Sequence, residues 1–393
     1  MATIAVLGTL DTKGHEHLFV AEQLRKLGHN TLLIDVGCTG QPQVEPDITC
    51  WEVASLAGVD LKALIAKGDR GESVAAMALA APQMLAKLHQ ESRIAGVTSL
   101  GGGGGTAIAT AAMRALPIGV PKLMVSTLAS GNTAHYVGTS DIVMMPSIVD
   151  VAGLNRISRL VLTRAAGAVA GMVSVEVSVD QASPLIVASM FGNTTQCVNE
   201  AKSILEASGY EVLVFHATGT GGRAMEALIE SGMVAGVLDI TTTEWADELV
   251  GGVLSAGPQR LDAAGKRGVP AIVVPGCLDM ANFGERQSVP EKYAHRNLYI
   301  HNPQVTLMRT SVEECRRLGE ILAQKLNRYR GPVTVLLPTR GISIISTEGQ
   351  PFHDPAADAA LFDTLTQQLS PTIQVKRLDT AINDPAFATA CAE

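Results

Sequence analysis

Residues 3–41 read TIAVLGTLDTKGHEHLFVAEQLRKLGHNTLLIDVGCTGQ, and this one segment contains a complete strand, helix and strand. The apolar run 3–8 predicts a strand, and 31–37 predicts a second one. Between them, residues 15–27 have the pattern of a helix that ends in a turn at Gly28. A strand, a helix and a strand in this order indicate a parallel sheet.

Further apolar runs follow the same pattern. Residues 93–100, 121–127 and 141–146 are nearly continuous in apolar side chains, as is typical of strands buried on both faces of a sheet. A helix is expected over 106–116. The first 180 residues therefore predict one doubly wound α/β unit.

The pattern then repeats at a constant offset of 181 residues. Residues 184–222 can be laid over 3–41, so that Val6 meets Val187, Gly28 meets Gly209 and Gly40 meets Gly221. The sequence therefore predicts an α/β protein of two tandem Rossmann-like domains with mainly parallel sheets, covering residues 1–180 and 181–393. The join is expected in the polar, proline-containing stretch 177–184. Paired domains of this kind usually leave a cleft between them.

Composition narrows the class of protein. The chain has 393 residues, of which 47% are hydrophobic and 17% charged, as in a packed globular protein. A net charge of −8 without a basic run argues against nucleic-acid binding, and no tract approaches eighteen consecutive apolar residues, which argues against a membrane span. The start lacks signal-peptide features, so we expect a cytoplasmic protein. Six cysteines without a CxxC pair indicate reduced thiols and no zinc motif.

Five consecutive glycines lie between a predicted strand and a predicted helix, in SLGGGGGTAIATAAM (99–113). Each glycine costs roughly 0.5–1 kcal/mol relative to alanine, so the run needs a reason. Glycine N–H groups at the positive end of a helix form an anion cradle, most often for a nucleotide phosphate. A flexible lid or tight packing is the alternative. The cradle would comprise Gly101, Gly102, Gly103, Gly104, Gly105 and Thr106.

Polar residues follow the neighbouring strands at the same predicted sheet edge. GTLDTKG (8–14) is not a P-loop, but its hydroxyls and lysine could grip phosphates and Asp11 could hold Mg²⁺; equally, Asp11 or Thr12 could be an ordinary N-cap and Lys13 a solvated charge. Asp35 stands where a ribose-binding carboxylate would lie, or forms a turn. The residues proposed for this edge are Thr9, Asp11, Thr12, Lys13, Asp35, Thr127, Gly131 and Asn132.

The second half offers a less specific set of groups. The polar stretch 279–310 is longer than an ordinary connection, and long ordered loops are often functional. Cys277 could be a nucleophile activated by a histidine such as His301, with Asp279 nearby, although a lone cysteine in a loop is more often structural. FHATGTGG (215–222) ends another predicted strand and could form a second anion cradle.

The order of VLGTLDTKG, SLGGGGGT, VSTLASGN, PGCLDMANFG, HNPQVTLMRT and LLPTRGIS resembles the Tm-1-like ATP-binding domain family along the whole chain. The resemblance implies two Rossmann-like subdomains, ATP with Mg²⁺ at the first of them, and a homo-oligomer, most simply a dimer. It places the first three motifs near the nucleotide. The last three would line the inter-domain cleft, with Arg340 as a candidate contact for an anionic substrate group. The resemblance also allows a separate TIM-barrel partner protein.

Two functions of different classes fit these residues. The first is an ATP-dependent enzyme of kinase or ligase type, with ATP on the first domain and a small anionic metabolite in the cleft. The second is a nucleotide-binding sensor or interaction module without chemistry, suggested by the missing P-loop and the lack of a clear base and nucleophile pair. An NAD-dependent oxidoreductase is disfavoured, because no acidic residue ends the strand 121–127.

Overall fold

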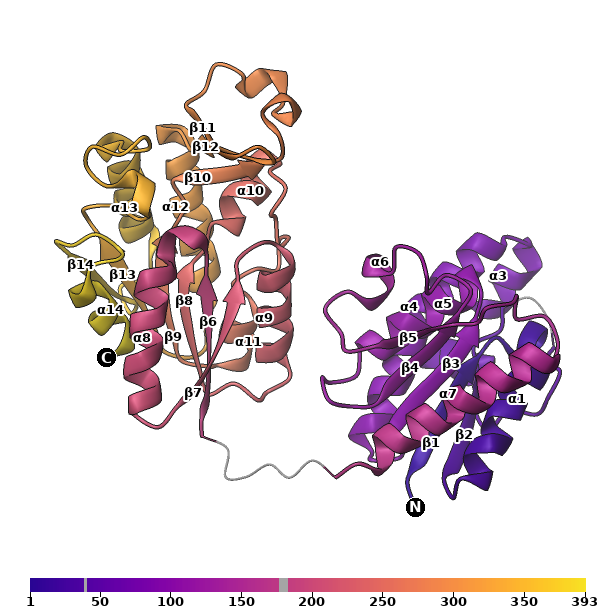
Figure 1. Ribbon diagram of the computed structural model, residues 1–393. Helices are drawn as coiled ribbons and strands as arrows, with labels where there is room; N and C mark the ends of the chain where they lie inside the picture. Colours follow the sequence, from indigo (N-terminus) through magenta and orange to yellow (C-terminus); the bar gives the residue numbers. More distant parts are fainter. Residues whose placement is uncertain (39–40, 177–182) are drawn as a thin grey trace. The chain divides into compact units, whose positions relative to one another are not determined.

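The computed structural model describes residues 1–38, 41–176 and 183–393. The chain divides into two compact units, Met1–Ser178 and Val179–Glu393, and each is described by itself (Figure 1). Apart from Ser183 and Pro184, the predicted join at 177–184 lies outside the described residues.

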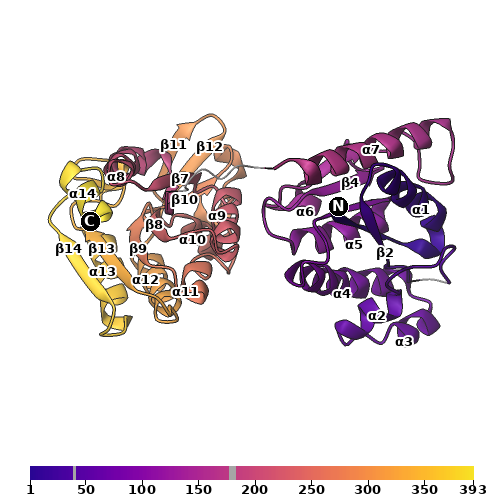
Figure 2. The ribbon, with the colours of Figure 1, turned by 90° about the horizontal axis from the view of Figure 1, so that it is seen from below.

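The first unit is a five-stranded parallel sheet of order β2-β1-β3-β4-β5. Helices α1 and α7 pack together on one face of the sheet, and α2, α4 and α5 cover the other (Figure 2). The elements are β1 Thr3–Gly8, α1 Leu10–Lys26, β2 Asn30–Asp35, α2 Cys50–Leu56, α3 Leu61–Lys67, α4 Arg70–Gln90, β3 Gly96–Gly101, α5 Gly103–Arg114, β4 Lys122–Ser126, α6 Ala134–Val137, β5 Val143–Pro146 and α7 Arg156–Ser174.

Burial in this sheet follows the apolar runs with one exception. Every residue of β3 and β4 is buried, as their continuous apolar sequences predict. The prediction that 141–146 is buried on both faces is wrong: β5 is an edge strand, and Val143 is 41% exposed. Helix α7 is long and apolar enough by composition to cross a membrane, but Leu162, Ala166 and Val169 pack in the core of this unit.

The second unit is a six-stranded parallel sheet of order β14-β13-β9-β8-β6-β7. Helices α8 and α14 pack together on one face, and α9, α11, α12 and α13 on the other. The elements are β6 Leu185–Met190, η1 Gly192–Thr194, α8 Thr195–Ala207, β7 Glu211–His216, α9 Thr220–Glu230, β8 Gly236–Thr241, α10 Glu244–Val250, α11 Ala263–Arg267, β9 Ala271–Gly276, β10 Met280–Phe283, η2 Arg286–Ser288, η3 Glu291–Tyr293, β11 Leu298–Asn302, β12 Val305–Arg309, α12 Val312–Leu326, β13 Val333–Pro338, η4 Ile344–Ser346, α13 Pro355–Gln368, β14 Gln374–Leu378 and α14 Pro385–Ala392.

The two units share one strand order, which confirms the prediction from the 181-residue repeat. Strands β2-β1-β3-β4 of the first sheet correspond to β7-β6-β8-β9 of the second. In both units the second strand lies outside the first, and the chain then crosses to the other side of the first strand. The order continues with β5 in the first sheet and with β13 and β14 in the second, which therefore has one strand more.

The polar stretch 279–310 is not an irregular loop. It forms β10, β11 and β12, which pair antiparallel in the order β10-β12-β11. This sheet could not be predicted from the sequence, because its strands have only four or five residues and are joined by polar turns and the short helices η2 and η3. The mainly parallel architecture therefore carries one small antiparallel addition.

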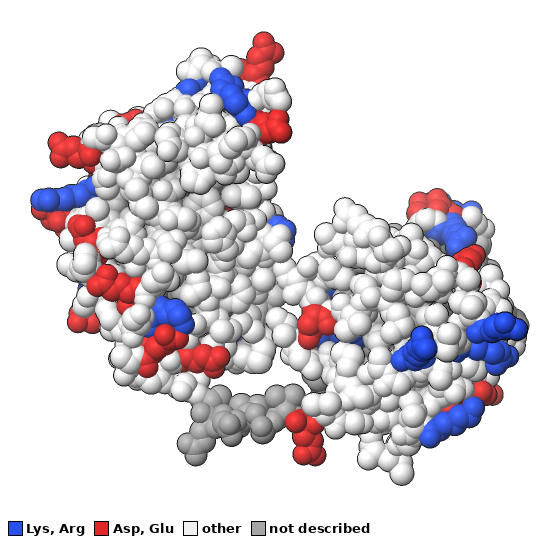
Figure 3. All heavy atoms as spheres, viewed as in Figure 1, with Lys and Arg blue, Asp and Glu red and all other residues white. Residues whose placement is uncertain are grey.

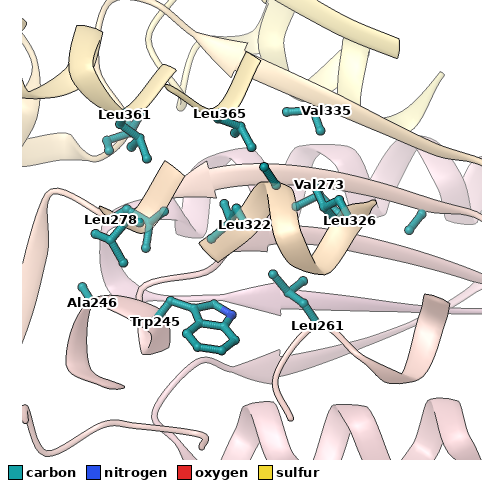
Figure 4. Packing of buried hydrophobic residues seen from close by; sticks show 14 of the residues in the cluster. Trp245, Ala246, Leu261, Val273, Leu278, Leu322, Leu326, Val335, Leu361 and Leu365 are labelled. Carbon is teal, nitrogen blue, oxygen red and sulfur yellow. The ribbon is translucent and has the colours of Figure 1, made fainter. Parts of the chain in front are cut away.

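The largest core lies in the second unit between the sheet and helices α12 and α13. Leu322 and Leu326 of α12 lie beside Leu361 and Leu365 of α13 and the strand residue Val273 (Figure 4). The predicted cap of α12 is present: the Ser311 side chain accepts a hydrogen bond from the N–H of Glu314. On the face shown in Figure 3, basic and acidic side chains are interspersed in each unit.

Candidate functional site

A cavity of about 220 Å³ lies at the carboxyl ends of β1 and β3 in the first unit. This edge of an open parallel sheet is where ligands bind most often. The start of α1 and the start of α5 form two of its walls, and the start of α4 adds a third. The lining residues are Thr9, Asp11, Thr12, Lys13, Cys38, Arg70, Val74, Gly102, Gly103, Gly104 and Gly105.

The glycines of this cavity are not required by the fold. Helix α5 begins at Gly103, so they form its first turn rather than a loop before a helix at Thr106. None of residues 102–105 has a positive φ. A Cβ added to Gly103 would lie 4.0 Å from its nearest neighbour, Leu128, and one added to Gly104 would lie 3.6 Å from Val74, which is ordinary contact. Neither backbone strain nor tight packing explains them, so the space is available to a ligand.

Two basic side chains line the cavity without an acidic partner among the described residues. Lys13 lies at a kink in α1, with φ −135°, and its Nζ donates to the carbonyl of Val151 at 2.5 Å. Arg70 is the first residue of α4 and is exposed. Together with the N–H groups at the start of α5, these charges favour an anion in the cavity. Sequence reasoning missed Arg70, because a single exposed arginine at a helix start has no motif around it.

Asp11 and Asp35 have different environments. The Asp11 carboxylate lines the cavity and accepts a hydrogen bond from the N–H of Cys38 at 3.1 Å. Asp35 is fully buried and does not line the cavity: one carboxylate oxygen accepts from Leu10 N at 3.0 Å and from Gly37 N at 2.8 Å. Burial raises the pKa of Asp35. The structure therefore favours the turn-forming alternative over the ribose contact: Asp35 closes a turn with Gly37 and binds the first N–H of α1, a place that Asp11 or Thr12 was expected to take.

The remaining predicted binding residues lie outside this cavity. Gly101 ends β3, and Thr106 is buried, with its hydroxyl 2.7 Å from that of Ser126. Thr127 is the neighbour that an added Cβ at Gly102 would meet, at 3.7 Å. Gly131 closes a turn onto Leu128, and the Asn132 side chain accepts from Ala134 N. The loop after β4 therefore borders the site at Thr127 and Leu128, and neither lines the cavity.

The second unit contains a carboxylate where the first has only glycine. Glu244 stands three residues after the end of β8, as Gly104 stands three residues after the end of β3. Its side chain accepts hydrogen bonds from Gly219 N at 2.7 Å and Gly222 N at 3.1 Å. The second anion cradle predicted in 215–222 is therefore already filled by the protein, and a Cβ at Gly222 would lie 2.2 Å from this carboxylate.

The residue that fills the cradle differs between the repeats. Gly219 and Cys38 are equivalent at the 181-residue offset, and the N–H of each is bound by a carboxylate. In the second unit the carboxylate comes from the start of α10. In the first it comes from Asp11, after β1, which leaves the start of α5 clear. The open cavity is thus a specific difference between two related units.

The four predicted catalytic residues are not assembled into one site. Cys277 is fully buried with φ +58°, and burial raises the pKa of its thiol well above the ordinary value, so it is not an activated nucleophile. Asp279 is fully buried as well. His301 is exposed on β11, and Arg340 is exposed and ion-paired with Asp379 at 2.8 Å. Two of the four residues, Cys277 and Asp279, are therefore buried, and the other two are exposed. The four side chains do not meet at one accessible site.

Asp279 belongs to a buried ionic group. Its carboxylate accepts a hydrogen bond from the Ser343 hydroxyl at 2.7 Å. Burial raises its pKa to about 7, although the nearby Arg309 opposes this shift. Arg309 is itself paired with Asp358 at 2.6 Å. Two buried carboxylates therefore share one guanidinium.

The Asp279→Asn variant is expected to lose a pH dependence of stability. Native Asp279 keeps its proton up to about pH 7, whereas the unfolded chain releases it near 3.8, so the wild-type free energy of unfolding falls as pH rises between these values. This cost reaches about 4 kcal/mol at most by pH 8. Urea unfolding at pH 5 and pH 8 should show a smaller fall for Asp279→Asn than for the wild type or an exposed control, Asp379→Asn. Equal falls in all three would contradict the assignment.

Comparison with known proteins shows that both units of the chain match domains of one protein family. Residues 2–178 match the N-terminal domain, and residues 183–393 the C-terminal domain, of the uncharacterised protein family UPF0261. The chain belongs to the UPF0261 family. A UPF0261 protein of Clostridium tetani is 50% identical over 99% of this chain and 97% of its own length. One from Rhizobium meliloti is 48% identical over the same shares.

The UPF0261 chain is also homologous to the N-terminal region of a plant protein, which confirms the resemblance seen in its motifs. The ToMV resistance protein Tm-1 of Solanum lycopersicum is 40% identical over 98% of this chain, which spans 54% of the tomato protein. Among solved structures, a thioesterase domain from the curacin biosynthetic pathway aligns with 54% of this chain and 91% of its own, at 14% identity and a TM-score of 0.26. So low a score carries no functional argument.

Proposed function

We propose that this chain binds a nucleotide phosphate in the first unit, with ATP as the nucleotide and Mg²⁺ as its counterion. The observation that carries the proposal is the run Gly102–Gly105, which leaves room at a helix start that the fold does not need. Phosphate oxygens approach backbone N–H groups closely only where side chains are absent. Lys13 and Arg70 would then neutralise the phosphate charge.

The choice of ATP with Mg²⁺ follows from the family resemblance and is compatible with the cavity. Mg²⁺ commonly keeps several water ligands and is held by one or two carboxylates together with substrate phosphates. Among the described residues no group of three or more histidine, cysteine or acidic side chains could hold a metal alone. Asp11, at the cavity wall, is the carboxylate that we assign to a phosphate-bound Mg²⁺.

The fuller version of the proposal is an ATP-dependent enzyme acting on a small anionic metabolite. The alternative is a sensor without chemistry, and the burial of Cys277 and Asp279 favours it, because neither side chain is accessible to substrate. Incubation with ATP and Mg²⁺ in the presence of metabolite pools separates the two. Product formation supports the enzyme, and binding without turnover supports the sensor.

Calorimetry of the full chain with ATP and Mg²⁺ tests the binding site itself. We expect one ATP per chain, because Glu244 fills the corresponding place in the second unit. Inorganic triphosphate should compete, since the phosphates make the main contacts. Two ATP molecules per chain, or no binding in the presence of Mg²⁺, would contradict the proposal.

A further inference from the structure

A second and larger cavity lies within the second unit, at the carboxyl ends of β13 and β14. We call it the Arg340 groove; its walls come from residues 339–348, the start of α13, and residues 377–384. Its volume is about 830 Å³, within the range of roughly 300–1,000 Å³ found for small-molecule sites. Most of the motif from LLPTRGIS to the start of α13, which the proposed nucleotide site does not use, surrounds this groove.

The inner wall of the groove carries a nearly buried carboxylate. Asp358 lines it and is only 9% exposed. One Asp358 oxygen accepts a hydrogen bond from Arg309, which is buried and also lies near Asp279. Burial raises the pKa of Asp279 to about 7, so Asp358 is the carboxylate that balances Arg309. Such buried ionic groups seldom improve stability and are common beside functional sites. Because Asp358 lines the groove, a cationic ligand group could bind its carboxylate beside Arg309.

The outer rim of the groove carries two arginines. Arg340 pairs with Asp379, and the two side chains are 65% and 77% exposed. Arg377 pairs with Asp363, at 45% and 53% exposure. Exposed pairs of this kind contribute about 0–1 kcal/mol, so either guanidinium can exchange its partner for a ligand carboxylate at little cost. The rim can therefore receive an anionic ligand group.

We propose that the Arg340 groove binds a small zwitterion, with its ammonium group on Asp358 and its carboxylate on Arg340 and Arg377. An α-amino acid is the simplest molecule with these two groups. Neither half of the groove suits a ligand of one sign: a simple anion meets the carboxylates of Asp358 and Asp363, and a simple cation leaves the arginine rim unused. The proposal does not depend on the nucleotide site, so it is tested without ATP.

The test uses L-norvaline and its two halves, which differ by one charged group each. Pentanoate lacks the ammonium group, and 1-butylamine lacks the carboxylate. Binding to the full chain is measured by calorimetry and by the shift in Tm. L-norvaline should bind at least about tenfold more tightly than either half, since each charged hydrogen bond contributes roughly that factor or more. Equal binding of pentanoate, equal binding of 1-butylamine, or no binding of L-norvaline would overturn the proposal.

Variants locate the binding. Arg340→Gln removes an exposed side chain and should weaken L-norvaline binding at least about tenfold. Arg316→Gln is the matched control, because Arg316 is an exposed arginine of α12 that pairs with Glu313 and does not line the groove. Asp358→Asn tests the ammonium contact and should weaken L-norvaline binding. This variant is compared with the wild type if its urea unfolding remains cooperative. Unchanged binding in Arg340→Gln, or the same loss in Arg316→Gln, would overturn the proposal.

Discussion

The Gly103→Val variant is expected to lose ATP binding completely and to fold as the wild type does. Gly103 is the first residue of α5 and lines the cavity. A branched side chain there would occupy the space that we assign to phosphate and would keep its oxygens away from the helix N–H groups. The fold has room for it, because the nearest atom to an added Cβ is Leu128 Cδ1 at 4.0 Å. Valine also has a higher helix propensity than glycine by several tenths of a kcal/mol.

Calorimetry with ATP and Mg²⁺ measures the loss of binding, and urea unfolding shows whether the variant folds as the wild type does. The matched control is Gly167→Val, because Gly167 is an exposed helical glycine of the same unit with no atom within 4 Å of an added Cβ. It should bind ATP normally and unfold at a similar urea concentration. If a folded Gly103→Val protein kept the wild-type affinity, the glycine run would need another explanation.

The fold could be predicted because its signal is local and repeated. Continuous apolar runs identify buried parallel strands without knowledge of their partners, and the 181-residue repeat required that both units share one topology. The antiparallel sheet of 280–309 could not be found in this way. Its strands are short, and β11 exposes three of its five residues, so its sequence resembles a polar loop.

The candidate site was partly predictable for the same reason. Gly102–Gly105 and the residues after β1 are consecutive in sequence, and the parallel sheet brings their two segments to one edge. Arg70 reaches the cavity from a helix that no motif marks, so only the three-dimensional arrangement reveals it. The candidate catalytic role of Cys277 is disfavoured for the opposite reason: residue type does not report burial, and the structural alternative fits the buried side chain.

The filled cradle of the second unit predicts the largest loss of stability. Arg260 is 1% exposed, and its guanidinium binds Asp239 at 2.6 Å, Glu244 at 2.6 Å and Glu226 at 3.2 Å. Replacing it with methionine leaves three buried or nearly buried carboxylates facing one another without a cation. Removing one partner of a single buried pair costs about 3–5 kcal/mol, and a whole domain is stable by only about 5–15 kcal/mol. We therefore expect Arg260→Met to unfold the second unit partly or wholly at pH 7.

The pH dependence of this variant separates charge repulsion from lost packing. Without Arg260, the repulsion among the three carboxylates favours proton binding by the native state over proton binding by the unfolded chain. Its free energy of unfolding should then increase as pH falls from 7 towards 5, more steeply than in the wild type. The control Arg316→Met removes an exposed pair and should cost less than about 1 kcal/mol. An Arg260→Met protein that lost no more stability than this control at pH 7, by urea unfolding, would contradict the role assigned to Arg260 in neutralising these carboxylates.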